Sequence, residues 1–428
     1  MKYISIPFSH LLFVLLMPGA GWCQLKHSTQ TLYPSYKGLV MAGYQGWFRT
    51  AGDGSGASHF AYGDEKRCGI DMWPDVSEYE KTYPTPWKLA NGETARFFSS
   101  YDKSAIDLHF KWMQDYGIDG VFVQRFANNV RTARNLDYCN TVLANCREGA
   151  NLHGRTYAVM YDLSGLPAGH IDDVMNDWRS LRKKMLITED SAYLHHRGKP
   201  LVAVWGIGFS DDRKYTLEEC RRLIEFFKHD PEAGGCTVMI GVPAHWRELD
   251  RDATSDPQLL EVVKLADVIS PWTVGRYTNL DGANDYAEKL LKPDLDWCRQ
   301  RGIDYLPVVF PGFSWYNMYG KAYNLAPRQR GRFLWSQFLG AKQAGASMVY
   351  VAMFDEVDEG TAIFKCANDV PVAVKSKFVT YDGLPSDYYL KMVGAGAKLI
   401  RGEALKEAMP KGPSFSSQKD GTRPFNIP

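Results

Sequence analysis

The stretch MFDEVDEGT (353–361) concentrates four carboxylates, at Asp355, Glu356, Asp358 and Glu359. It directly follows an apolar run, MVYVAM, so we expect the carboxylates at the end of a buried strand. Crowding and removal from water raise carboxyl pKa values, so one group keeps its proton at neutral pH while another ionises. Such a pair can cleave a glycosidic bond. A magnesium or calcium site and a solvated acidic turn remain alternatives, because hard cations also prefer oxygen ligands.

Further polar and aromatic residues follow other apolar runs of the sequence. In barrels of parallel strands, the groups that contact substrate lie on the loops after the strands. We therefore predict that thirteen residues contact substrate. They are Tyr44, Gln45, Trp47, Gln124, Arg125, Tyr161, Asp162, Trp205, His245, Trp246, Trp272, Trp315 and Asp355. We expect Arg125 to clamp substrate or to orient an acidic residue.

Tryptophan is concentrated at these positions. Five of the 12 tryptophans follow predicted strands: Trp47, Trp205, Trp246, Trp272 and Trp315. Exposed rings are unfavourable unless a ligand covers them. The flat apolar faces of sugars suit such rings in a cleft with few cations. The alternative for each ring is a plug over the barrel core.

Eight short apolar runs alternate with helical patterns along the chain. The expected strands lie at 38–48, 118–126, 156–163, 200–209, 236–242, 268–272, 305–310 and 348–354. The expected helices lie at 104–116, 130–146, 171–185, 216–227, 257–265, 286–301 and 328–344. Continuous apolarity without alternation is typical of strands buried on both faces. The pattern predicts an α/β fold, a single (β/α)8 TIM-type barrel with a long loop after strand one.

Two later segments complete the predicted domain, which spans residues 24–409. We expect added strand structure at 372–381 and a closing helix at 387–409. Residues 410–428 are polar and rich in Pro, Gly and Ser, which is typical of a flexible C-terminal tail.

The first 23 residues have the plan of a signal peptide. Lys2 precedes the apolar run LLFVLLM (11–17), which Pro18 ends and which is too short to span a bilayer. We therefore predict an exported protein, either periplasmic, secreted or at the outer surface. Cys23 makes a lipid anchor an alternative to cleavage of the segment. Nothing else in the sequence predicts a transmembrane segment.

Composition and motifs exclude several classes of partner. The 428 residues include 50 Lys plus Arg and 49 Asp plus Glu, which gives a net charge of +1. The sequence therefore lacks the excess of positive charge that is typical of nucleic-acid-binding proteins. The sequence contains no CxxC, HExxH, calcium-loop, GxGxxG or GxxxxGK[ST] motif. We therefore predict no metal and no nucleotide cofactor, and an oligo- or polysaccharide as the partner.

The segment FDEVDEGT (354–361) resembles the catalytic segment of glycoside hydrolase family 99, the endo-α-mannosidases and endo-α-1,2-mannanases. That family carries Phe/Trp-Asn-Glu-Trp-x-Glu-Gly-Thr there, and Glu356 and Glu359 match its two catalytic glutamates. The stretches GLVMAGYQGWF (38–48) and WMQDYGIDGVFVQRF (112–126) are similar to this group as well.

The resemblance implies a metal-independent hydrolysis that retains anomeric configuration. Glu356 would act as base on the 2-hydroxyl of the sugar, and Glu359 would protonate the departing oxygen and later activate water. Asp355 and Val357 stand where the family has Asn and Trp, so the implied substrate is an α-linked glycan, with α-mannan as one candidate. A non-catalytic carbohydrate-binding barrel and an inverting α-glucanase are the alternatives.

Overall fold

The computed structural model describes residues 31–57, 62–63 and 67–404. The predicted signal peptide, with Cys23, and the predicted tail at 410–428 lie outside these residues. Within the described part of the chain, no helix is long and apolar enough to cross a membrane.

Parallel strands form a closed ring at the centre of the molecule. They are β1 (Val40–Tyr44), β4 (Gly120–Phe126), β5 (Thr156–Asp162), β7 (Lys199–Trp205), β8 (Thr237–Pro243), β9 (Val268–Trp272), β10 (Asp304–Tyr305), β11 (Val308–Val309) and β12 (Val349–Val351). Their hydrogen-bonded order is β10-β9-β8-β7-β5-β4-β1-β12-β11. Their burial on both faces explains the continuous apolar runs.

The two ends of this order belong to one segment, because only Leu306 and Pro307 separate β10 from β11. The Leu306 N–H donates to the Ile269 carbonyl at 2.8 Å, and the Pro307 carbonyl accepts from the Tyr350 N–H at 3.0 Å. The predicted seventh strand therefore joins β9 to β12 and closes the ring. Pro307 has no N–H for the ladder, which is why the strand is split. The predicted (β/α)8 barrel is confirmed.

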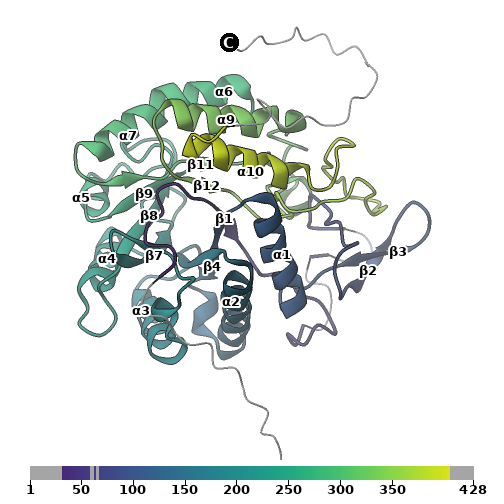
Figure 1. Cartoon of the computed structure of the whole chain (residues 1–428), viewed down its shortest axis with the longest axis horizontal. Coiled ribbons are helices and arrows are strands. Elements are labelled where there is room, and N and C mark those ends of the chain that lie inside the picture. Colours follow the sequence, from purple (N-terminus) through teal and green to yellow (C-terminus); the bar gives the residue numbers. More distant parts are fainter. Residues whose placement is uncertain (1–30, 58–61, 64–66, 405–428) are drawn as a thin grey trace, which may run out of the picture.

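Helices surround the ring on its outer side (Figure 1). The main ones are α1 (Lys103–Tyr116), α2 (Ala133–His153), α3 (Ile171–Ser180), α4 (Leu217–His229), α5 (Gln258–Val263), α6 (Leu280–Tyr286), α7 (Lys292–Arg299), α9 (Arg332–Gln343) and α10 (Tyr388–Arg401). Shorter helical elements are η1 (Asn129–Arg131), η2 (Leu181–Met185), η3 (Ile187–Glu189), η4 (Ala287–Leu291), α8 (Tyr316–Tyr319) and η5 (Gln329–Gly331). Gly117 ends α1 with φ 77°, a conformation that favours glycine.

The long loop after β1 contains an antiparallel hairpin, β2 (Tyr83–Lys88) and β3 (Thr94–Phe97), which projects from the side of the barrel (Figure 1). A second short pairing joins β6 (His195–His196) to β7. The strand expected at 372–381 is wrong. Its one strand-type pairing is an isolated bridge from Val372 to Lys88, and the Val379 N–H instead donates to the Asp71 carbonyl in the long loop after β1.

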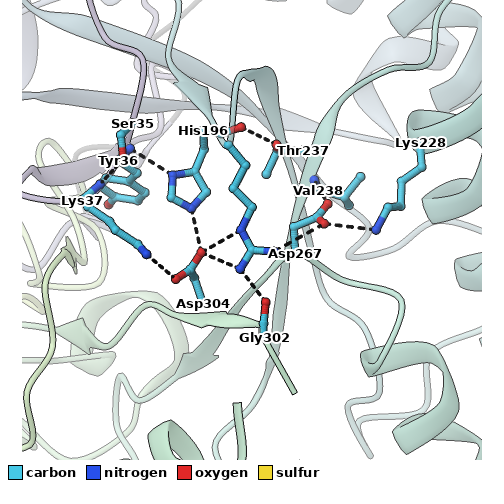
Figure 2. Close-up of polar contacts among 11 residues, drawn as sticks. Ser35, Tyr36, Lys37, His196, Lys228, Thr237, Val238, Asp267, Gly302 and Asp304 are labelled. Carbon is cyan, nitrogen blue, oxygen red and sulfur yellow. Dashed lines mark hydrogen bonds and ion pairs between the residues drawn. The ribbon is translucent and has the colours of Figure 1, made fainter. Parts of the chain in front are cut away.

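A polar network ties together the N-terminal ends of the strands (Figure 2). Asp304, at the start of β10, pairs with Lys37 at 3.1 Å, with His196 at 3.0 Å and with Arg197 at 2.6 Å. Asp267, just before β9, pairs with Lys228 at 3.2 Å and accepts from the Val238 N–H. In barrels this end contributes to stability, and the opposite end carries the chemistry.

Candidate active site

A cavity of about 850 Å³ lies at the C-terminal ends of the strands. It brings together many of the residues predicted from the sequence: Gln45, Trp47, Gln124, Asp162, Trp205, Trp272, Trp315, Glu356 and Glu359. Loops after strands far apart in the sequence therefore contribute to one site.

Three predicted site residues lie outside the barrel wall, and their assignment to substrate contact is wrong. The buried Arg125 guanidinium pairs with Asp177, with Nη2–Oδ1 at 2.6 Å and Nε–Oδ2 at 2.9 Å. The Tyr161 hydroxyl donates to the same carboxylate at 2.6 Å. The Tyr44 hydroxyl meets His109 Nδ1 at 2.8 Å.

The alternation of side chains along a strand explains these errors. Successive residues point to opposite faces, so of the pairs Gln124–Arg125 and Tyr161–Asp162 only one member can face the cavity. Gln124 and Asp162 line the cavity, and their neighbours pack against the helices.

Strand β8 contributes neither of its predicted residues to the cavity. The Trp246 indole is buried, donates to Asp294 at 3.1 Å and packs against Trp297. His245 lies beside Asp250 at 3.7 Å. The Trp205 ring covers the end of β8, since a Cβ at Gly241 would lie only 2.4 Å from Trp205 Cδ1. The Trp246 prediction is therefore wrong, and the substrate role of His245 stays a prediction.

Asp355 holds the loop after β1 in place and does not contact the cavity. Its fully buried carboxylate accepts from the Gln45 N–H at 2.8 Å and the Gly46 N–H at 2.9 Å. Burial raises the Asp355 pKa to about 6, although these two N–H groups oppose the rise. The predicted substrate contact is wrong, because both carboxylate oxygens are committed to backbone.

Glu356 lies in a loop that closes on itself after β12. Its Oε1 accepts from Gln45 Nε2 at 2.6 Å, and its Oε2 accepts from the Thr361 hydroxyl at 3.1 Å. The Thr361 and Ala362 N–H groups both donate to the Glu356 carbonyl. Glu356 is nearly fully buried, whereas Glu359 is half-buried, and both line the cavity.

Two residues that the sequence does not single out form hydrogen bonds to the backbone of the loop after β12. Asp71, in the long loop after β1, donates its N–H to the Val357 carbonyl at 3.1 Å, and its carboxylate accepts from the Ser314 hydroxyl. The buried Arg328 donates from Nη2 to the Gly360 and Ala362 carbonyls at 2.8 and 2.7 Å.

Burial and crowding shift the pKa values of these carboxyls. Burial raises the pKa of Glu356 well above its usual range, and the carboxylates of Glu359 and Asp358 add to the rise. Burial raises the pKa of Glu359 to about 7; the Trp315 indole opposes that rise and Asp162 adds to it. Each carboxyl therefore holds a proton more readily than a free glutamate does, and the ionisation of one opposes that of the other.

Aromatic rings line the cavity walls. Trp205 and Trp272 meet edge to face at 5.4 Å, Trp47 stacks on Phe126 at 5.3 Å, and Trp315 meets Phe313 at 4.9 Å. Flat apolar walls above acidic groups suit a ring-shaped polyhydroxylated ligand.

Solved structures similar to this chain include glycoside hydrolases. The GH99 endo-alpha-mannosidase from Bacteroides thetaiotaomicron matches over 86% of this chain and 99% of its own, with TM-score 0.64 and 14% identity. Its complex with bis-tris-propane matches over 86% and 98%, with TM-score 0.63 and 15% identity. A glycoside hydrolase-like protein matches over 81% and 96%, with TM-score 0.50 and 12% identity. The fold matches that of TIM-barrel glycoside hydrolases. No family model matches the sequence, and no curated protein matches it significantly.

Two arginines that also line the cavity carry weak sequence signals. Arg213 and Arg276 line it, but Arg213 pairs with Asp211 at 2.7 Å and Arg276 pairs with Asp252 at 2.5 Å. Arg213 lies in an irregular segment after β7, where no periodic pattern marks its direction. Across residues 31–57, 62–63 and 67–404, no group of three or more His, Cys, Asp or Glu side chains is arranged to hold a metal ion.

Proposed function

We propose that this protein is a retaining glycoside hydrolase that cleaves an α-linked glycan, with α-mannan as a candidate substrate. The observation that carries the proposal is the position of Glu356 and Glu359, which share one aromatic-lined cavity at the C-terminal end of the barrel. The likeness to the endo-alpha-mannosidase fold supports the same class of reaction.

In the proposed reaction, Glu356 accepts the proton of the sugar 2-hydroxyl, and that oxygen attacks C1 to form an anhydro-sugar. Glu359 gives its proton to the departing glycosidic oxygen. It then takes a proton from the water that opens the intermediate, so that the anomeric configuration is retained. The rings of Trp205, Trp272 and Trp315 hold the glycan across the pair.

The proposed roles require one shared proton. Because both pKa values are raised, the pair keeps a proton at neutral pH. Hydrogen bonds from Gln45 and Thr361 favour the ionised form of Glu356. The proposed acid role requires this proton to be on Glu359 when the sugar binds.

The decisive experiment incubates the protein and its Glu359→Gln variant with a panel of α-linked oligosaccharides. We expect wild-type protein to release shorter products and the variant to bind the same glycan without turnover. Wild-type turnover by Glu359→Gln would end the assignment. NMR of the first-formed anomer tests retention, and initial inversion would favour the α-glucanase alternative.

A non-catalytic carbohydrate-binding barrel predicts a different result. Calorimetry would then show glycan affinity in wild-type protein, with no product at any pH. The two carboxyls inside the cavity argue against it, since a binding protein gains nothing from holding buried acids with raised pKa values.

A further inference from the structure

The loop after β11 carries an exposed group of apolar side chains beside the cavity. Tyr319 is 60% exposed, Tyr323 is 43% exposed and Leu325 is 39% exposed. The remaining large exposed hydrophobic residues in the described part of the chain are aliphatic: Leu32, Leu152, Val372 and Val374. The described chain therefore gathers its large exposed aromatic residues on one short loop.

This loop is held firmly by hydrogen bonds at both ends. The carboxylate of Asp71 accepts from the Tyr316 and Asn317 N–H groups at 2.8 and 2.7 Å, which fixes the start of α8. At the far end, the Tyr323 hydroxyl donates to the Phe378 carbonyl at 3.0 Å, and Ala326 pairs with Phe313. The exposed side chains are therefore presented on a fixed backbone.

A chain of ring contacts leads from the cavity to this exposed surface. Phe313 meets Trp315 at 4.9 Å, and Trp315 meets Tyr319 at 5.1 Å. Tyr319 and Leu325 line the same cavity as Glu359, whereas Tyr323 lies beyond it. Apolar surface thus continues from the candidate catalytic groups out to solvent.

We propose that Trp315, Tyr319, Tyr323 and Leu325, here called the mouth platform, bind a polysaccharide chain that extends from the catalytic cavity past its rim to Tyr323. The inference rests on the proposed function and names its substrate class, a polymer longer than the cavity. Sugar rings stack their apolar faces on exposed aromatic rings and keep their hydroxyls in water. That makes a glycan chain the occupant that suits a platform continuous with a sugar-binding cavity.

The test uses the Glu359→Gln protein, so that binding is measured without turnover. The probes are yeast α-mannan and soluble starch as polymers, with α-1,2-mannotriose and maltotriose as short ligands. We expect Tyr323→Ala and Tyr319→Ala each to weaken polymer binding by at least about fivefold, as for loss of a ring stack. Tyr323→Ala should leave trisaccharide binding unchanged, and Tyr323→Phe should restore polymer binding.

The control is Leu152→Ala, which removes an exposed apolar side chain on α2 and should bind polymers like its parent. Unchanged polymer binding in both tyrosine variants would overturn the platform while leaving the proposed function standing. A wild-type dimer in light scattering that Tyr323→Ala abolishes would also overturn it, because the platform would then contact a second copy. If the Glu359→Gln protein binds neither the polymers nor the trisaccharides, the result contradicts the proposed function itself, and with it the platform.

Discussion

The side-chain amide of Gln45 donates to Glu356 Oε1 at 2.6 Å and connects the first and last strands of the barrel at the candidate catalytic centre. The same residue donates its backbone N–H to Asp355 at 2.8 Å. One residue after β1 therefore holds the loop after β12 and, through its amide, favours the ionised form of the first glutamate of that loop.

Replacing Gln45 by Leu should make Glu356 harder to ionise. A hydrogen bond to a charged group contributes about 1.5–3 kcal/mol, so its loss raises the Glu356 pKa. The acidic limb of the pH–rate profile should move to higher pH, and kcat at pH 6 should fall by roughly tenfold or more. The control Gln114→Leu, on the exposed face of α1, should leave the profile unchanged. An unshifted acidic limb in Gln45→Leu would contradict this role.

The two glutamates should differ in their response to the leaving group. A glycosyl fluoride departs without help from an acid. The Glu359→Gln variant should therefore keep most of its kcat/KM, which reports the first step, on a fluoride substrate and lose it on a natural glycan, whereas Glu356→Gln should lose both. Steady-state rates on the two substrates measure this. The reverse pattern would exchange the roles of the two residues.

The pKa of Glu359 sets the upper limit of the working pH range. Burial raises that pKa to about 7, so an acid role requires pH values near or below neutral. As pH rises through this value, Glu359 loses its proton and kcat on a natural glycan should fall by about tenfold per unit. With a glycosyl fluoride, the alkaline fall should disappear. A flat alkaline limb with both substrates would exclude Glu359 as the acid.

The sequence predicts the barrel well, because strands buried on both faces and amphipathic helices leave continuous and periodic patterns. It also locates Glu356 and Glu359, since the carboxylates follow an apolar run directly. It does not resolve which residue of a pair faces inward, as Arg125 and Tyr161 show. A slip of one position moves a side chain to the other face of the wall.

Arg328 is invisible to pattern reasoning because its role depends on contacts made only in the folded chain. Its guanidinium joins the Gly360 and Ala362 carbonyls and lies over the ring of Tyr389 at 4.6 Å. Local periodicity cannot reveal a cation that supports a loop more than 30 residues away in the sequence.

Replacing Arg328 by Met should loosen the loop that carries both glutamates. The carbonyls of Gly360 and Ala362 flank Thr361, whose hydroxyl donates to Glu356, so misplacement should lower kcat by at least about tenfold. KM should change less, because the aromatic walls are untouched. Arg328→Lys should recover part of kcat, and the exposed Arg332→Met should behave as wild type. Wild-type kcat in a folded Arg328→Met protein would show that the hydrogen bonds from Arg328 to the Gly360 and Ala362 carbonyls are not needed to position the glutamates.

Asp304, at the opposite end of the barrel, should make stability depend on pH. Burial alone would raise its pKa, but hydrogen bonds from His196, Arg197 and Lys37 lower it well below its usual range. A carboxyl with a depressed pKa in the folded state stabilises above its unfolded value near 4, and this contribution is lost as pH falls further. We expect Asp304→Asn to lower the free energy of unfolding at pH 7 by about 1–3 kcal/mol.

The pH dependence of the stability difference between wild type and Asp304→Asn distinguishes the loss of the carboxylate charge from a change in side-chain packing. In urea unfolding at pH 7, 5 and 3, wild type and Asp304→Asn should differ fully at the two higher values. The difference should narrow as pH falls below about 4, because the unfolded wild-type chain then binds a proton at this carboxyl that the folded chain does not. The control Asp296→Asn breaks an exposed pair with Arg299 and should change stability by less than about 1 kcal/mol. If the Asp304→Asn difference persisted unchanged at pH 3, it would come from packing, and the ion pairs at the strand starts would contribute nothing measurable.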